Sequence, residues 1–114
     1  MRAMTASGSG DRRRAPRTAV AIACTLRRRT GSPVAGRTVD LGPAGMCVAT
    51  ARPLATDEAV EFELPQLPGD VHGHARVMRE QRYGVYALRF EGLPERLRDQ
   101  LAAFAAAPRA GARA

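Results

Sequence analysis

The chain has 114 residues, of which 45% are hydrophobic and 25% charged, a composition typical of one small soluble domain and too short for two. Its formal net charge of +7 equals the charge of residues 1–40 alone, where nine arginines face two aspartates; residues 41–107 carry seven arginines against nine acids, and two more arginines follow. A charge confined to one segment counts against a general nucleic-acid binder, because such proteins spread cations over a folded face. A membrane-spanning helix is also excluded, since no apolar run approaches the roughly 18 residues that it needs.

The first segment with a distinct character is an arginine-rich stretch at residues 11–17. Residues 1–10 before it are small and polar, which predicts a disordered tail. The stretch holds Arg12, Arg13, Arg14 and Arg17, and Pro16 favours extended backbone, so we expect an arm and not a helix. Arginine combines a permanent charge with a fork of donors and a flat surface, which suits phosphate and base recognition. The alternative is a solvated basic tail.

Six strands and one helix are predicted after the arm. Alternation of larger and smaller apolar residues over residues 19–26 indicates the first strand. Five further strands are separated by turn residues, with a hairpin turn at residues 81–82: 34–41, 46–50, 60–64, 71–77 and 83–90. A helix is expected over residues 94–106, because Pro94 suits a first turn and Leu97, Leu101 and Phe104 share one face. Residues 108–114 are expected to form a second disordered tail.

The order of these elements predicts an all-β fold with one terminal helix. Short strands with turns at intervals of roughly eight to twelve residues favour a small six-stranded antiparallel β-barrel, formed by residues 18–90. No crossover helix separates the strands, which argues against parallel pairing. The helix is expected to bury its apolar stripe against the barrel, so that residues 11–107 form one domain.

The two cysteines, Cys24 and Cys47, are too few for a disulfide framework and lack metal-ligand spacing. Both lie in apolar strands, which predicts buried thiols in a reducing cytoplasm. The apolar stretch after the arm is about as long as the shortest signal-peptide cores, but it alternates like a strand and runs into Arg27, Arg28 and Arg29. We therefore expect a cytoplasmic protein without membrane insertion.

Patterns for catalysis or metal binding are weak. His72 and His74 share one strand face and could supply two metal ligands, but a third ligand is not evident, and exposed histidines are the simpler interpretation. Glu61 and Glu63 share a face in the same way, as solvated carboxylates. The sequence has no phosphate-binding loop and no dinucleotide fingerprint. We expect no enzymatic activity, no catalytic residue, no metal and no cofactor.

A second motif, Asp40-x-Gly42-x-x-Gly45, begins at the end of the second predicted strand and continues through the turn after it. Taken alone it indicates a strand-ending turn, since glycine and proline are what such turns require. Together with Arg13-x-x-x-Arg17 upstream, it resembles the PilZ family, whose pattern is an RxxxR arm followed by a [DN]xSxxG turn. The arginine pair matches fully, whereas Gly42 stands where the family usually has serine.

The resemblance extends over roughly residues 11–106, through the order of the strands and residues 84–90 before the helix. It implies a small barrel that binds the bacterial messenger cyclic di-GMP. By this resemblance Arg13 and Arg17 would pair with the phosphates and lie over the guanines, and Asp40 would accept from the Watson–Crick edge of a guanine. Gly45 would let the backbone approach the ligand. Arg12 and Arg14 would supply further phosphate contacts or stay solvated.

The resulting hypothesis is a cyclic di-GMP receptor or adaptor, not an enzyme. The ligand would order the N-terminal arginine arm over the barrel, and the altered surface would signal through a protein partner. One alternative is a degenerate PilZ-like adaptor that no longer binds the nucleotide, which Gly42 favours. A nonspecific nucleic-acid binder is a third class, which the confinement of charge to one arm disfavours, so that no nucleic-acid partner is expected.

Overall fold

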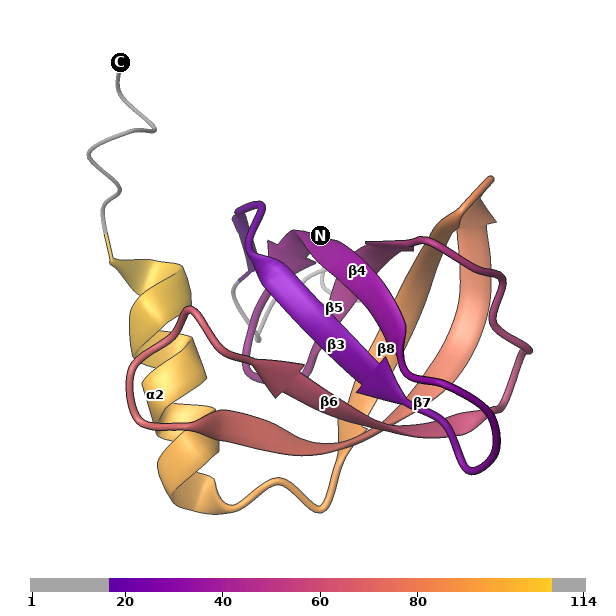
Figure 1. Ribbon diagram of the computed structural model, residues 1–114. Helices are drawn as coiled ribbons and strands as arrows, with labels where there is room; N and C mark the ends of the chain where they lie inside the picture. Colours follow the sequence, from indigo (N-terminus) through magenta and orange to yellow (C-terminus); the bar gives the residue numbers. More distant parts are fainter. Residues whose placement is uncertain (1–16, 108–114) are drawn as a thin grey trace, which may run out of the picture.

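The computed structural model describes residues 17–107, and residues 1–16 and 108–114 lie outside that range. Figure 1 shows a β-barrel with one helix, α2 (Glu95–Ala106), packed at its left side. The strands, in chain order, are β2 (Thr18–Ala19), β3 (Ala23–Arg27), β4 (Val34–Leu41), β5 (Gly45–Thr50), β6 (Ala59–Leu64), β7 (Val71–Arg82) and β8 (Val85–Glu91).

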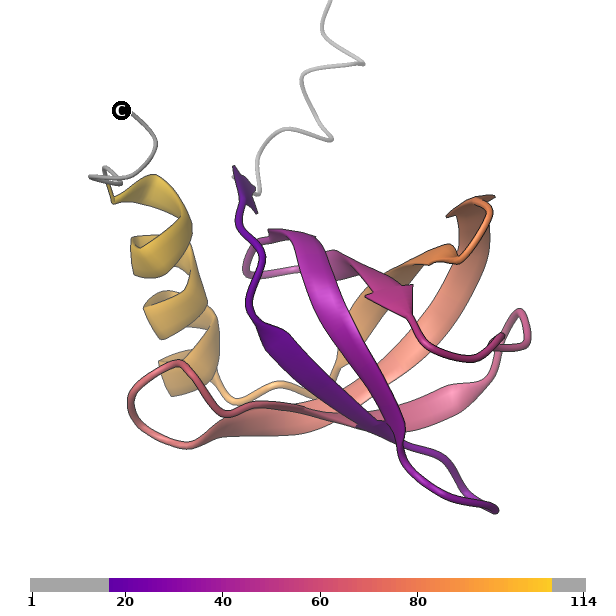
Figure 2. The ribbon, with the colours of Figure 1, turned by 45° about the horizontal axis from the view of Figure 1, so that its top comes forward.

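The strand pairings are antiparallel and close into a ring. In spatial order the barrel strands are β4, β3, β6, β7, β8 and β5, and β5 pairs again with β4. Figure 2 shows β3 and β4 running side by side across the front of this ring. The two-residue β2 adds to the end of β4, where Thr18 lies opposite Leu41. The predicted six-stranded antiparallel barrel with a terminal helix is confirmed.

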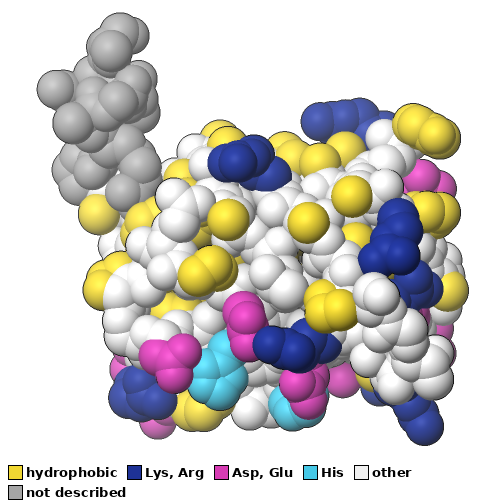
Figure 3. All heavy atoms as spheres, viewed as in Figure 1, with side chains coloured by type: hydrophobic (Ala, Val, Ile, Leu, Met, Phe, Trp, Pro, Cys, Tyr) yellow, Lys and Arg dark blue, Asp and Glu magenta, His cyan; other side chains and the backbone are white. Residues whose placement is uncertain are grey.

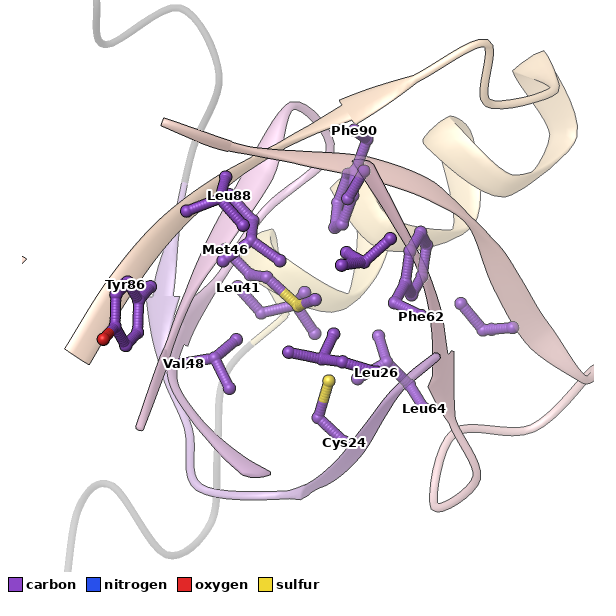
Figure 4. Packing of buried hydrophobic residues seen from close by; sticks show 14 of the residues in the cluster. Cys24, Leu26, Leu41, Met46, Val48, Phe62, Leu64, Tyr86, Leu88 and Phe90 are labelled. Carbon is purple, nitrogen blue, oxygen red and sulfur yellow. The ribbon is translucent and has the colours of Figure 1, made fainter. Parts of the chain in front are cut away.

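The barrel interior is filled by apolar side chains from alternate strand positions. Leu26, Met46, Phe62 and Leu88 point into it and are each at most 1% exposed (Figure 4). The rings of Phe62 and Phe90 stack with their centroids 4.7 Å apart. Removal of this apolar surface from water is the main force that holds the barrel together.

The first strand differs from its prediction, because it is divided into β2 and β3 with residues 20–22 between them. Thr38 of β4 bridges the break. Its N–H donates to the Ile22 carbonyl at 2.9 Å, and its hydroxyl accepts from the Ile22 N–H at 3.0 Å and donates to the Val20 carbonyl. The Thr38 side chain is only 2% exposed, and these bonds satisfy its hydroxyl.

Next to Thr38, a β-bulge changes which face of the barrel the following residues occupy. Thr38 pairs with Val48 and faces inward, but the register then shifts, so that Asp40 pairs with the outward-facing Cys47. Val39 is the extra residue. Since successive side chains alternate between the two faces of a strand, this single insertion places Asp40 on the outside of the barrel and returns Leu41 to the core.

The β7–β8 hairpin turns two residues later than predicted. β7 continues to Arg82, well past the expected end at residue 77, and Tyr83 and Gly84 form the turn. Gly84 adopts a φ of +77°, a conformation that glycine takes without strain, and its N–H donates to Glu80 Oε2 at 3.0 Å. The glycine therefore determines where the hairpin closes.

Helix α2 covers one end of the barrel, as its apolar stripe predicts. Its Leu97 and Leu101 are buried, and Phe104 packs against the core from a partly buried position. Pro94 precedes the helix, and its carbonyl accepts from the Leu97 N–H at 2.9 Å. Within the described range, no helix has the length and hydropathy needed to cross a membrane.

Both cysteines are free and buried, in agreement with the sequence-based expectation. Cys24 lies in the barrel interior, where burial raises the pKa of its thiol to about 12. Cys47 is equally buried but lies on the outer side of β5. That position brings it into the site described next.

Candidate functional site

Arg17 and Asp40 meet on the outer surface of the barrel. Although 23 residues separate them in sequence, Arg17 Nη1 lies 2.8 Å from Asp40 Oδ1. β2 positions the arginine, because Thr18 and Ala19 pair with the end of β4, and the bulge at Val39 turns the carboxylate outward. Their side chains are 40% and 29% exposed, so the pair remains accessible to a ligand.

The two oxygens of the Asp40 carboxylate have different surroundings. Oδ1 accepts from Arg17 and also from the Cys47 N–H at 3.2 Å. For Oδ2 the part of the chain from 17 to 107 provides no hydrogen-bond donor. Within this part of the chain, one side of the carboxylate is therefore anchored to the barrel, and the other has unused acceptor capacity.

Cys47 lies directly beneath this pair. Its Sγ is 3.7 Å from Arg17 Nη1. Burial raises the pKa of the Cys47 thiol, the Asp40 charge adds to the increase, and Arg17 opposes it. The thiol is consequently neutral around pH 7 and forms part of an uncharged floor.

That floor is apolar and extends along the outer face of β4, β5 and β8. It is a second hydrophobic cluster, separate from the barrel interior, whose members are Val39, Cys47, Ala49, Val85 and Ala87. Antiparallel pairs align it, since Cys47 lies opposite Ala87 and Ala49 opposite Val85. Its central members Cys47, Val85 and Ala87 are 3%, 7% and 8% exposed. Apolar side chains next to an ion pair suit a ring whose edge is polar.

The Gly42–Gly45 turn closes the site at one end. Its backbone is bonded internally, with the Gly42 N–H donating to the Gly45 carbonyl at 3.0 Å. A Cβ on Gly45 would lie 2.2 Å from the Leu88 carbonyl oxygen, so this glycine allows β5 to approach β8. Among the described glycines, those with positive φ are Gly31, Gly69, Gly84 and Gly92, and Gly42 is not one of them.

The structure thus brings together Arg17, Asp40, Gly42 and Gly45 from the predicted site. Arg12, Arg13 and Arg14, the other predicted arginines, lie outside the described residues. Sequence reasoning missed Cys47 and Ala87 as parts of the site. Strand alternation places both on an outer face, but only the bulge at Val39 shows that Asp40 shares that face.

The other candidate residues form no comparable site. His72 and His74 lie opposite Glu63 and Glu61 on β7 and β6. Within residues 17–107, no group of three or more His, Cys, Asp or Glu side chains could hold a metal ion. A hollow of about 500 Å³ beside Arg28 lies near the turn between β3 and β4, at the opposite end of β4 from Asp40.

Comparisons with known proteins identify the family and the fold. The PilZ domain family model matches residues 11–107. The chain is similar to the PilZ domain of CeSA from a cellulose-synthesizing bacterium, with 18% identity, a TM-score of 0.61, and coverage of 78% of this chain and 93% of that one. It is also similar to the Bacillus subtilis inhibitor of motility (MotI/DgrA), with 13% identity and a TM-score of 0.69 over 82% of this chain and 49% of that one. The chain thus spans about half the length of the motility inhibitor, and at these identities the likeness concerns the fold. No curated protein matches the chain.

Proposed function

The chain belongs to the PilZ domain family, and on this premise we propose that it is a receptor for cyclic di-GMP, acting by binding and not by catalysis. The observation that supports this most strongly is the Arg17–Asp40 pair at 2.8 Å above an apolar floor. Cyclic di-GMP offers two phosphates and two guanines, so a ligand site for it needs cations, a carboxylate and a surface for flat rings. Residues of all three kinds lie together here.

In the proposed mechanism, the ligand exchanges the partners of this ion pair. The Watson–Crick edge of guanine has two adjacent N–H donors, which match the two oxygens of Asp40. When guanine occupies the carboxylate, Arg17 is released to pair with a phosphate. An exposed ion pair contributes only about 0–1 kcal/mol, so the exchange replaces a weak contact with two charge-assisted ones.

Arg13 supplies the second cation of the proposed site. It precedes Arg17 by one RxxxR interval, and together they would hold the two phosphates, with Arg12 and Arg14 as further candidates. We propose that the bound ligand orders the arm of residues 11–17 over the outer face of the barrel. The changed surface would then be read by a protein partner in the cytoplasm, where free thiols such as those of Cys24 and Cys47 stay reduced.

Isothermal titration calorimetry with cyclic di-GMP tests the receptor proposal. We expect saturable binding to the full chain, and no binding of cyclic di-AMP at the same concentrations. Adenine has an acceptor where guanine has the ring N–H, so it cannot donate twice to Asp40. Absence of heat with cyclic di-GMP, or equal affinity for both dinucleotides, would contradict the proposed role of Asp40.

A second candidate is a PilZ-like adaptor without nucleotide binding, and Gly42 in place of the usual serine favours it. Calorimetry separates the two, since the adaptor gives no heat with either dinucleotide. Nonspecific nucleic-acid binding is distinguished by salt. A ligand with two phosphates gives a shallow dependence of log affinity on log salt, whereas an arginine arm on duplex DNA gives a steep one.

A further inference from the structure

One row of residues crosses four strands on the outer face of the barrel, from Asp40 to Arg79. Asp40 of β4 lies opposite Cys47 of β5, and Cys47 lies opposite Ala87 of β8. Ala87 in turn lies opposite Arg79 of β7. Residues opposite one another on neighbouring strands point to the same face of a sheet, so Arg79 points outward like Asp40. Three strand spacings place their backbones about 14 Å apart, on the two sides of the apolar floor.

A β-bulge gives Arg79 this orientation, just as another bulge does for Asp40. Val77 of β7 is buried in the barrel interior, and the register shifts at Met78, so that Arg79 faces outward. Without this extra residue, strict alternation from Val77 would turn Arg79 toward the interior. Two insertions, at Val39 and Met78, therefore place a carboxylate and a guanidinium on one outer face.

Arg79 has no partner among the described residues. Its side chain is exposed and forms no hydrogen bond or ion pair with any residue from 17 to 107. Its neighbour Glu80 lies opposite Tyr86 and accepts from the Gly84 N–H at 3.0 Å. By contrast Arg89, which lies opposite Gly45 in the next row, is 3.6 Å from Glu91. Arg79 thus offers an uncompensated charge and unused donors beside the apolar floor.

Acidic side chains gather on another part of the barrel surface. Glu61 and Glu63 of β6 lie opposite His74 and His72 of β7. Figure 3 shows acidic and histidine side chains together in the lower half of that view, where Figure 1 draws β6. A ligand with negative charges therefore meets less repulsion beside Arg79 than over β6.

Cyclic di-GMP has one base for which the proposed site provides no polar partner. In that site Asp40 accepts from one guanine, and Arg13 and Arg17 pair with the phosphates, which leaves the second guanine. Guanine presents two adjacent acceptors, N7 and O6, and the fork of an arginine donates to both. We infer that Arg79 binds the N7–O6 edge of the second guanine, so that the ligand spans the apolar floor from β4 to β7. The assignment rests on the proposed receptor function and adds a residue that determines its specificity.

Calorimetry with two cyclic dinucleotides tests this contact on the full chain. The ligands are cyclic di-GMP and 3′,3′-cyclic GMP-AMP, in which adenine replaces one guanine. With its guanine on Asp40, the mixed dinucleotide presents adenine to Arg79, and adenine has an amino donor where guanine has O6. We expect the parent to bind cyclic di-GMP roughly tenfold more tightly than the mixed dinucleotide, because the bidentate contact is lost with adenine.

Arg79→Met should remove this preference. The variant side chain is similar in length but has no donor, so the affinity for cyclic di-GMP should fall roughly tenfold and that for cyclic GMP-AMP much less. Arg82→Met is the matched control, since Arg82 lies opposite Val85, one row farther from Asp40, and forms no ion pair with any residue from 17 to 107. It removes the same charge, and it should weaken both ligands alike and keep the preference. Both side chains are exposed, so both variants should melt like the parent.

Three results overturn the contact: the parent binds both dinucleotides equally, Arg79→Met keeps the preference of the parent, or Arg82→Met loses the preference to the same extent. In each case the receptor proposal stands, provided that cyclic di-GMP binds the parent and Asp40→Asn weakens this binding. If cyclic di-GMP does not bind the parent, the receptor proposal and the contact with Arg79 are both overturned.

Discussion

Two arginine–carboxylate pairs on the same barrel differ in how completely their carboxylates are used. In the first, Arg28 contacts both oxygens of Glu58, at 2.6 and 2.9 Å, and Glu58 also accepts from the Ala55 N–H at 2.9 Å. In the second, Arg17 contacts only one oxygen of Asp40. The side chains of the first pair are 28% and 16% exposed, against 40% and 29% for the second.

This difference separates a structural ion pair from one that can exchange its partner. The Arg28–Glu58 pair holds the loop before β6 against the chain after β3, and a bidentate geometry with an added backbone donor leaves little acceptor capacity for a ligand. At Asp40, no residue from 17 to 107 donates a hydrogen bond to the second oxygen, and both side chains of the pair are partly exposed to water. A carboxylate with unused acceptor capacity on an accessible face is therefore the better candidate for ligand binding.

The largest effect is expected from replacing Gly45, which is not part of the Arg17–Asp40 pair but holds together the strands next to it. Gly45→Ala places a Cβ 2.2 Å from the Leu88 carbonyl oxygen, a backbone atom that cannot move without separating β5 from β8. We expect a loss of about 3 kcal/mol in the free energy of unfolding, at the upper end for overpacking, measured by urea denaturation without ligand. Ala44→Ser, at an exposed position of the same turn, is the control and should unfold like the parent.

The second prediction removes the exchangeable pair itself. Arg13→Ala, Arg17→Ala or Asp40→Asn should each weaken cyclic di-GMP binding by roughly 1.5–3 kcal/mol, about one to two decades, because a charge-assisted contact is lost. For Arg17→Ala and Asp40→Asn, the stability without ligand should change by less than about 1 kcal/mol, as for other exposed pairs. Calorimetry and thermal melting measure the two quantities, with Arg96→Ala as control. Unchanged affinity in the Asp40 variant would show that the carboxylate is not part of the site.

The third prediction concerns the structural pair and its pH dependence. The hydrogen bond from Arg28 holds the pKa of Glu58 below its ordinary value of 4.5. A carboxyl whose pKa is lower in the folded state stabilises the fold above its ordinary pKa, and this contribution is lost as the pH falls through the folded value. The melting temperature should therefore decrease below about pH 4.5, and Glu58→Gln should melt several degrees lower at pH 7 with a flatter acid profile.

Glu91 limits how flat that profile becomes. Arg76 lowers the pKa of Glu91 in the same direction, chiefly through a hydrogen bond, so part of the acid dependence remains in Glu58→Gln. Glu58→Gln should bind cyclic di-GMP like the parent, because Glu58 is remote from Asp40. If Glu58→Gln melts at the same temperature as the parent at both pH 7 and pH 4, the Arg28–Glu58 pair does not stabilise the fold.

The barrel could be predicted from the sequence because the signals for its strands and turns lie within short segments of the chain. Alternating residue size reports which side of a strand faces the core, and Gly-Pro turns report where strands end. The bulge at Val39 could not be predicted in this way, since it lies beside Thr38, whose bonds to Val20 and Ile22 join segments far apart in the sequence. The motif residues could be identified because they are close together in the sequence. The position of Cys47 beneath the Arg17–Asp40 pair could not be predicted. That position requires the register between β4 and β5, which alternation alone leaves open.

The smallest effect is expected at Gly42, where the family usually has serine. Gly42→Ser adds a hydroxyl two residues after Asp40, and one neutral hydrogen bond to the ligand would contribute roughly 1 kcal/mol, so cyclic di-GMP should bind at most about tenfold more tightly. Gly42 has no positive φ, so serine should not strain the backbone, and the melting temperature should stay within the error of the parent. Tighter binding with unchanged melting would support a receptor whose site lacks one contact. Lower melting together with weaker binding would mean that this position is needed by the turn, and the missing hydroxyl would then carry no functional meaning. If neither parent nor variant binds cyclic di-GMP, the open carboxylate of Asp40 is not a nucleotide site, and the adaptor alternative replaces the receptor.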